Sequence, residues 1–278
     1  MHRTKLGLVC FIVIIFFVLA LIQPAYSAGL ALDGSGSNYC GTPCSATLTT
    51  TNANDVIVVF AVSTGASFGG MPVASGLSFK VRDSTTFGPH FVGEWWAIAS
   101  TPLVAETVKV TTTSGSAIGL VVWGVSGANT GSPFDPSLAS PATSSSLTPN
   151  CSPGPTCSVP ISVTIPSTSN ANDMILGMAG DDGGLEAYSA GSGGFSLIAA
   201  GAPAAAAEYK IVSSTKSSLP VPMTLNNDGG ITVWVMFGDA VQTATTPPLP
   251  IPEYPFGLAL LAVLAVICYG VIRHRTRT

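Results

Sequence analysis

The chain repeats a stretch of its own sequence, and any fold assigned to it must hold both copies. NANDVIV at residues 52–58 recurs as NANDMIL at residues 170–176, 118 positions further on. Three more matches follow in the same order: GLSF (76–79) with GFSL (194–197), Glu94-Trp95 with Glu208-Tyr209, and VVW (121–123) with TVW (232–234). Four ordered matches predict two copies of one folding unit, with shorter loops in the second.

Each copy is predicted to contain about six β-strands, because runs of β-branched residues alternate with turn residues. The expected strands are 45–50, 56–63, 77–82, 91–99, 107–112 and 118–125 in the first copy, and 159–165, 174–179, 195–200, 208–213, 221–225 and 231–237 in the second. No stretch between the two ends of the chain has helical periodicity. Short strands without helices favour an all-β fold of the sandwich type.

Some of these strands are apolar on both faces. VIVVFAV at residues 56–62 is the clearest case, and residues 231–237 are similar. A strand of an ordinary two-layer sandwich presents one face to water. We therefore expect the two repeats to pack against each other, or to share one pair of sheets, as a single compact duplicated β-sandwich.

The N-terminus has the three parts of a secretory signal peptide. Two basic residues near the start are followed by an apolar stretch at residues 6–22 and then by Ala25-Tyr26-Ser27. Small residues at that spacing predict cleavage between Ser27 and Ala28. The exterior of the protein would then begin at Ala28.

The C-terminus predicts a membrane anchor. Residues 256–272 are apolar, and a helix of that length spans about 25 Å, slightly less than a bilayer core. The basic residues that follow, Arg273, Arg275 and Arg277, belong on the cytoplasmic side. The protein is therefore expected to be exported and anchored in the cytoplasmic membrane as a single-pass protein, with its N-terminal region outside.

A proline-rich segment precedes this anchor and ends in Pro252-Glu253-Tyr254-Pro255. Together with the apolar helix and the arginines, it resembles the PEF-CTERM type of C-terminal sorting signal of archaeal surface proteins. The resemblance covers about the last 27 residues, with Tyr254 in place of phenylalanine. It implies a surface-attached protein and a sortase-like processing enzyme as a partner, with either cleavage or retention of the helix.

The expected organisation follows from these boundaries. It comprises a signal peptide (1–27), repeat 1 (28–128), a Pro/Ser-rich connecting loop with a cysteine pair (129–158), repeat 2 (159–241), a Pro/Thr-rich stalk (242–255), the anchor or sorting helix (256–272) and a basic tail (273–278).

Four cysteines lie in the exported part, as two close pairs. Disulfides Cys40–Cys44 and Cys151–Cys157 are the favoured pairing in an oxidising exterior, and cross-pairing between the repeats is the alternative. Zinc is not favoured, because the spacings differ from those of zinc sites and no histidine lies nearby. Asn150 begins a glycosylation sequon whose middle residue is Cys151.

The charge of the exterior excludes one class of partner. Residues 28–250 contain five basic and thirteen acidic residues, and the basic ones do not cluster. Nucleic-acid binding needs a cationic surface to meet phosphates. We therefore expect no nucleic-acid partner.

Two patterns suggest chemistry but lack its context. GASFG at residues 65–69 resembles a nucleophile elbow, and Asp83 and His90 follow Ser67 in hydrolase order, yet the glycines and proline after Ser67 do not predict the helix that an elbow requires. DDGG at 181–184 and NNDG at 226–229 could supply oxygens to Ca²⁺, but hairpin turns explain both. No catalytic residue, cofactor or other metal is assigned.

One aromatic group could bind a ligand. On one interpretation Trp96 faces outward, and with Phe87 and His90 it would form a platform that stacks a sugar ring. Coverage by the other repeat is the competing and favoured interpretation. The sequence thus predicts a non-catalytic structural or interaction protein, adhesin-like or associated with a surface layer. Envelope glycans or other surface proteins would be its partners. A carbohydrate-binding module around Trp96 is the alternative, and a serine hydrolase is third.

Overall fold

Fifteen β-strands form the regular structure of the described residues, which in this computed structural model are 29–148, 157–181, 186–202, 204–227 and 231–244. These residues contain no helix, so the all-β prediction is confirmed. None of them, accordingly, forms a helix of the length and apolarity needed to cross a membrane. The predicted cleavage site, C-terminal helix and basic tail, and residues 245–255 of the predicted stalk, lie outside the described residues. The first residues of that stalk, 242–244, belong instead to the compact unit, where Thr243 bridges Ala128.

The strands fall into two halves. The first half holds β1 (Ala31–Gly41), β2 (Cys44–Leu48), β3 (Asp55–Thr64), β4 (Lys80–Phe87), β5 (His90–Ala99), β6 (Glu106–Val110) and β7 (Ala117–Ser126). The second half holds β8 (Ala142–Leu147), β9 (Cys157–Ser167), β10 (Met174–Asp181), β11 (Ala187–Ala190), β12 (Ser196–Ala202), β13 (Ala205–Ile211), β14 (Ser217–Asn227) and β15 (Val233–Val241).

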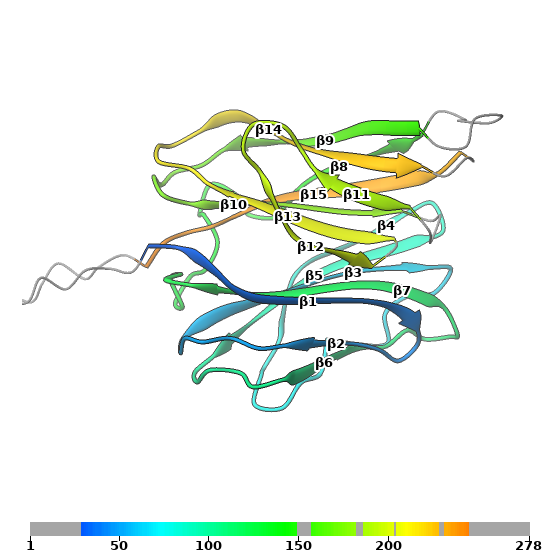
Figure 1. Cartoon of the computed structure of the whole chain (residues 1–278), viewed down its shortest axis with the longest axis horizontal. Coiled ribbons are helices and arrows are strands. Elements are labelled where there is room, and N and C mark those ends of the chain that lie inside the picture. Colours follow the sequence, from blue (N-terminus) through cyan, green and yellow to red (C-terminus); the bar gives the residue numbers. More distant parts are fainter. Residues whose placement is uncertain (1–28, 149–156, 182–185, 203, 228–230, 245–278) are drawn as a thin grey trace, which may run out of the picture. The chain divides into compact units, whose positions relative to one another are not determined.

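These strands make four stacked sheets (Figure 1). Two five-stranded sheets, β1-β7-β3-β5-β4 and β12-β13-β10-β15-β8, lie in the middle and face each other. The two-stranded sheet β2-β6 covers the outer face of the first, and the three-stranded sheet β11-β14-β9 covers the outer face of the second. Residues 28–244, called the body below, form one compact unit that contains all four sheets.

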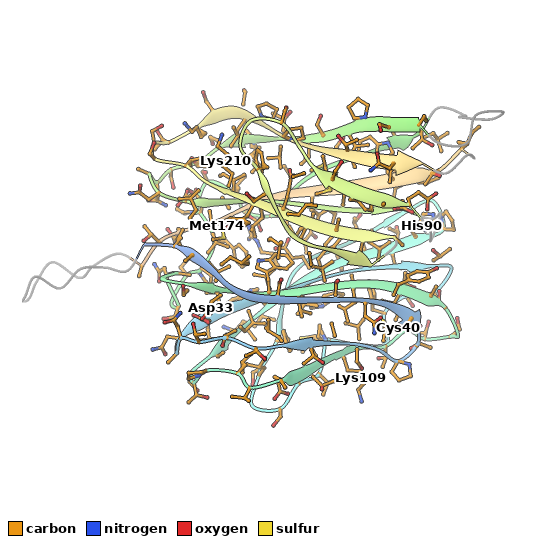
Figure 2. The ribbon with its side chains drawn as sticks, viewed as in Figure 1. Asp33, Cys40, His90, Lys109, Met174 and Lys210 are labelled. Carbon is orange, nitrogen blue, oxygen red and sulfur yellow. A yellow bond between two sulfur atoms is a disulfide. The ribbon has the colours of Figure 1, made fainter. Side chains whose placement is uncertain are left out.

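Three apolar clusters fill the spaces between the four layers. The central cluster joins both halves, with Phe60 of β3 edge-on to Phe237 of β15 at 5.8 Å and Met174 of β10 among its members (Figure 2). The alternate residues of β3, such as Ile57 and Val59, belong instead to the cluster beneath β2-β6. The inner strands are therefore apolar on both faces because each inner sheet is covered on both sides.

The two inner sheets have the same strand order when β1, β7, β3, β5 and β4 are matched with β8, β15, β10, β13 and β12. The registers refine one of the sequence matches. Val59 pairs with Trp95, whereas its counterpart Gly177 pairs with Glu208. The counterpart of Tyr209 is thus Trp96 rather than Trp95, one position away from the match that sequence letters give.

The repeated NAND segment forms the same turn in both halves. Asn54 and Asn172 both adopt a positive φ, 63° and 65°. The hydroxyl of Thr50 accepts the N–H of Leu103 at 3.0 Å, and the hydroxyl of Thr168 accepts that of Lys216 at 2.9 Å. The sequence of this segment is the same in both halves because both halves form the same turn with the same hydrogen bonds.

The contact between the inner sheets is polar on one side. Arg82 of β4 makes a two-pronged ion pair with Asp239 of β15 at 2.7 and 3.0 Å, and Glu94 of β5 is buried nearby. The register-matched positions are apolar and belong to the central cluster: Ile198, Trp123 and Ala207. One side of the interface is therefore an ionic junction and the other is ordinary core.

Cys40 and Cys44 form a disulfide between the end of β1 and the start of β2, as predicted (Figure 2). Cys157 at the start of β9 is also disulfide-bonded. Its predicted partner Cys151, and Asn150 of the sequon, lie outside the described residues. The segment expected to be a connecting loop, 129–158, contains β8, an edge strand whose Ser- and Thr-rich sequence lacks apolar alternation.

Candidate functional site

The outer layers of the two halves differ at one strand. In the second half, β11 pairs with β14 over four residues and completes a three-stranded outer sheet. The equivalent part of the first half is the segment 65–79, which meets β6 and the residues after it only at isolated bridges, Phe68 with Thr112 and Val73 with Lys109. The first half therefore has a loop where the second half has a strand.

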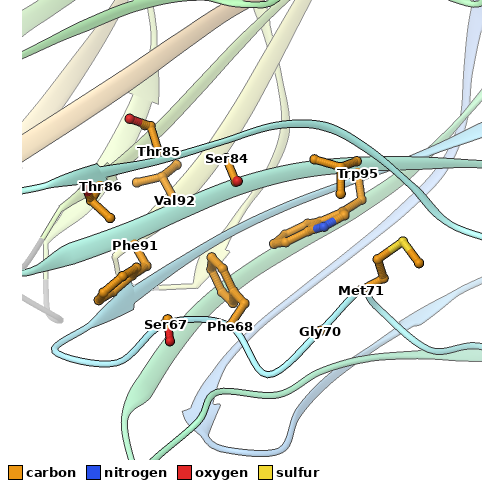
Figure 3. A pocket seen from close by; sticks show the side chains of 11 residues that line it. Ser67, Phe68, Gly70, Met71, Ser84, Thr85, Thr86, Phe91, Val92 and Trp95 are labelled. Atoms are coloured by element: carbon orange, nitrogen blue, oxygen red, sulfur yellow. The ribbon is translucent and has the colours of Figure 1, made fainter.

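A depression of about 570 Å³ lies between this loop and the outer face of β4 and β5 (Figure 3). Its lining residues are Ser67, Phe68, Gly70, Met71, Val81, Ser84, Thr85, Thr86, Phe91, Val92 and Trp95. None of these side chains is charged. The lining can therefore contact a neutral, largely apolar group and offer it hydroxyls, and a charged group would lose its hydration there.

Two aromatic rings fix one wall of the depression. Phe68 on the loop meets Trp95 of β5 edge-on at 4.9 Å (Figure 3). The Trp95 ring lies over Gly93, where an added Cβ would be 2.1 Å from the ring. The second half has Ala206 and Glu208 at the matching positions. Glycine at position 93 therefore makes room for a tryptophan that the second half lacks.

The rim is apolar and open to solvent. Met71 is 52% exposed and Val81 is 53% exposed, and both line the depression. Trp95, by contrast, is 3% exposed. An incoming group would thus touch the rim and the edge of Phe68 or Phe91 before it reached the indole.

The predicted aromatic platform lies on the other face of the same strands. Trp96 contributes to the central cluster, with Phe134 edge-on at 6.0 Å and the Lys80 ammonium 4.6 Å above its ring. His90 is 2% exposed, and it pairs with Phe87 across the β4–β5 hairpin. These three residues share a face, as strand alternation requires, and the second half covers that face at Trp96.

The residues of the predicted hydrolase triad are divided between the two faces. Ser67 lies in the depression, and its hydroxyl is 3.1 Å from that of Thr113. Asp83 pairs with Glu94, on the side of β4 and β5 that faces the second half, and His90 lies on that side as well. The fold does not bring Ser67 onto the face that holds Asp83 and His90.

The described parts of the two calcium candidates make contacts within the protein. The Asp181 carboxylate accepts a hydrogen bond from the hydroxyl of Tyr188, and the Asn226 side-chain oxygen accepts one from Ser158 at 2.9 Å. The rest of both segments, except Asn227, lies outside the described residues, as do the sorting motif Pro252–Pro255 and the tail arginines Arg273, Arg275 and Arg277.

Sequence reasoning missed the depression, although it named Ser67 within it. The available signal was Gly93, two residues before Trp95, because residues i and i+2 of a strand share a face and a glycine there leaves room for a large ring.

Comparisons with known proteins return nothing for this chain: no family, no curated protein and no solved structure matches it.

Proposed function

We propose that the protein is a surface-anchored, non-catalytic interaction protein, adhesin-like or associated with a surface layer, whose body binds a partner through the depression of the first half. The observation that carries this proposal is the asymmetry between the halves. Only the first half, within the described residues, has the loop 65–79 in place of a third outer strand, with Met71 and Val81 exposed on the rim. Exposed apolar side chains around a hollow are typical of interaction sites.

The proposed location rests on the two terminal sequence signals. The body would be exported through the N-terminal signal peptide and held at the cell surface by the C-terminal segment, either as a retained anchor or after processing by a sortase-like enzyme. The intact mass of the protein from cell envelopes tests this. A polypeptide that begins at Ala28 supports export through a cleaved signal peptide, and one that still contains Met1 contradicts that cleavage.

The shared strand order and the repeated turn support a duplicated β-sandwich, in which one ancestral unit was doubled and its copies joined face to face. On this proposal the second copy has the third outer strand, and the first copy has the binding loop in its place.

A carbohydrate ligand is the second candidate. Four hydroxyl side chains and three aromatic rings line the depression, a combination suited to a sugar. Trp95, the largest of these rings, is 3% exposed and offers no open face for a sugar to stack on, which favours a protein partner over a sugar.

The test uses the body, residues 28–244, and its variants Met71→Asp and Val81→Asp. A carboxylate on the rim must be desolvated when an apolar partner docks, so we expect binding to isolated cell envelopes to weaken at least about tenfold, equivalent to about 1.4 kcal/mol. Val104→Asp is the matched control, since Val104 is 84% exposed and outside the lining.

If Met71→Asp and Val81→Asp bind envelopes as strongly as Val104→Asp and the wild type do, the proposed site is overturned. A glycan array run with the same proteins separates the two candidates. Binding to defined glycans that is lost in Met71→Asp supports the carbohydrate module, whereas binding to envelopes after their glycans are removed supports a protein partner.

A further inference from the structure

Each half buries two aspartates side by side. In the first half, Asp33 of β1 is 7% exposed and Asp55 of β3 is 0% exposed. The Asp33 carboxylate accepts the backbone N–H groups of Thr51 and Asn52 at 3.0 and 2.8 Å, and their side chains at 2.8 Å. Asp55 lies within hydrogen-bonding reach of Asp33. Two carboxyl groups at that distance need a proton between them.

The second half builds the same arrangement from the repeated residues. Asp135 and Asp173 are both 0% exposed, and they lie within hydrogen-bonding reach of each other. The Asp135 carboxylate accepts the backbone N–H groups of Ser169 and Asn170 at 2.7 and 3.2 Å, and their side chains at 2.8 and 3.3 Å. In both pairs, one aspartate accepts hydrogen bonds from these donors and the other lies beside it.

The charged groups around the pairs do not neutralise them. In the first pair, the neighbouring charge that raises the pKa of Asp55 is that of Asp33. The second pair is near Asp239 of β15, whose charge is already matched by Arg82 of β4.

Two further carboxyl groups lie in the interior. Glu94 is 0% exposed and faces Asp239, Arg82 and Asp83, so three carboxyl groups share one guanidinium. Glu208 is 0% exposed and accepts only the N–H of Gly191, at 2.8 Å, among the hydrogen bonds of the described residues. Neither group has a cation of its own.

Burial is the main cause of the resulting pKa shifts. It raises the pKa of Asp55 to about 7 and that of Asp173 to about 8, and the hydrogen bond and charge of the neighbouring aspartate add to both. Burial also raises the pKa of Glu208 to about 7 and, with the charge of Asp239, raises that of Glu94 well above its usual value. Burial alone would raise the pKa of Asp33 and Asp135 too, but their hydrogen bonds lower it well below its usual range.

We infer that the folded body keeps a proton on one carboxyl of each pair, and on Glu94 and Glu208, so that it is most stable in acidic surroundings and loses stability as the medium becomes neutral and then alkaline.

The direction of this pH dependence follows from the number of protons that the folded and unfolded states bind. An aspartate or glutamate in the unfolded chain loses its proton near pH 4, but these folded groups keep theirs to about pH 7 or 8. Between those limits the folded state binds more protons, so the free energy of unfolding falls as pH rises. Below about pH 4, Asp33 and Asp135 reverse the slope, since their folded pKa is lowered. The maximum therefore lies near pH 4, below the usual range of about 5 to 8.

Urea unfolding of the full chain in mild non-ionic detergent, from pH 4 to pH 9, tests the inference. We expect the unfolding midpoint to fall steadily between pH 5 and pH 8, with a slope near pH 6 that corresponds to the release of about two or more protons. A flat midpoint, or one that rises across this interval, would overturn the inference.

The double variant Asp55→Asn, Asp173→Asn identifies the groups, because an asparagine amide can donate to Asp33 or Asp135 at every pH. It should lose about half of the slope, because Glu94 and Glu208 still keep their protons, and it should be more stable than the wild type at pH 8. Glu106→Gln, on the half-buried β6 residue Glu106, is the control and should keep the slope. A full slope in the double variant would contradict the assignment.

Infrared spectroscopy of the wild-type protein at pH 6 keeps the question decidable if the double variant does not fold. A protonated-carboxyl stretch at that pH is expected, and its absence would overturn the inference.

Discussion

The two halves of the body share a framework and differ in what is attached to it. Both have the same order of five inner strands, the same turn at the NAND segment and the same buried aspartate pair. They differ at the third outer strand, at the Gly93 and Trp95 positions, and at the ionic side of the central interface. Positions that set the register of a sheet are thus retained, whereas the outer layer and the contact between halves are free to diverge.

The largest effect on stability is expected from a substitution on the ionic side of the interface. Arg82→Ala leaves the fully buried Asp239 without its cation, beside Glu94, and should lower the free energy of unfolding by about 3–5 kcal/mol. Urea unfolding measures it.

The double variant Arg82→Met, Asp239→Leu makes that side apolar, as the opposite side already is with Ile198 and Trp123, and should recover most of the loss. A loss of less than about 1 kcal/mol in Arg82→Ala would mean that the ion pair does not hold the halves together.

Position 93 distinguishes the halves at the depression. Gly93→Ala places a Cβ 2.1 Å from the Trp95 ring and should cost about 1–3 kcal/mol while displacing the indole. The reciprocal change at the matched position, Ala206→Gly, should cost only about 0.5–1 kcal/mol. Unfolding in urea and tryptophan fluorescence measure the two effects. Equal costs and unchanged fluorescence would contradict the special fit of the ring on Gly93.

The smallest effect on stability is expected at the shared turn, and it should be equal in the two halves. Thr50→Val and Thr168→Val each remove a hydroxyl that accepts a backbone N–H, from Leu103 and Lys216, and each should cost about 1 kcal/mol. Urea unfolding of the two variants is compared directly. A clear difference between them would show that the turns, although alike in geometry, contribute unequally.

The inner framework could be predicted from the sequence because its strands have a recognisable pattern of apolar residues. The strands at 56–63 and 174–179 were predicted close to the observed β3 and β10. The apolar residues on both faces of 56–62 and 231–237 predicted that the repeats pack against each other or share one pair of sheets, and the central cluster joins both halves. β1, β8 and β11 were missed, since a Gly/Ser-rich strand, a Ser/Thr-rich edge and a four-residue strand have no apolar period to detect.

The site was less accessible. Aligning letters matched Trp96 with Lys210 and so allowed an outward platform, but the favoured interpretation, coverage by the other repeat, agrees with its packing against the central cluster. The register matches Trp96 with Tyr209 instead, and a shift of one residue exchanges the faces of a strand. The aspartate pairs were also missed, because Asp33 lies 22 positions before Asp55 and nothing in the local sequence links them. Long-range register is not encoded in short windows.

The burial of β3 and β7 on both faces also limits when the chain can fold during its synthesis. A first half that has emerged alone would present the apolar side of its inner sheet, with Val58 and Phe60, to water. That side becomes covered only when β10 and β15 arrive, and β15 ends at Val241. Nearly the whole body must therefore be synthesised before its core can close, and a chain that stops after the first half should aggregate rather than fold.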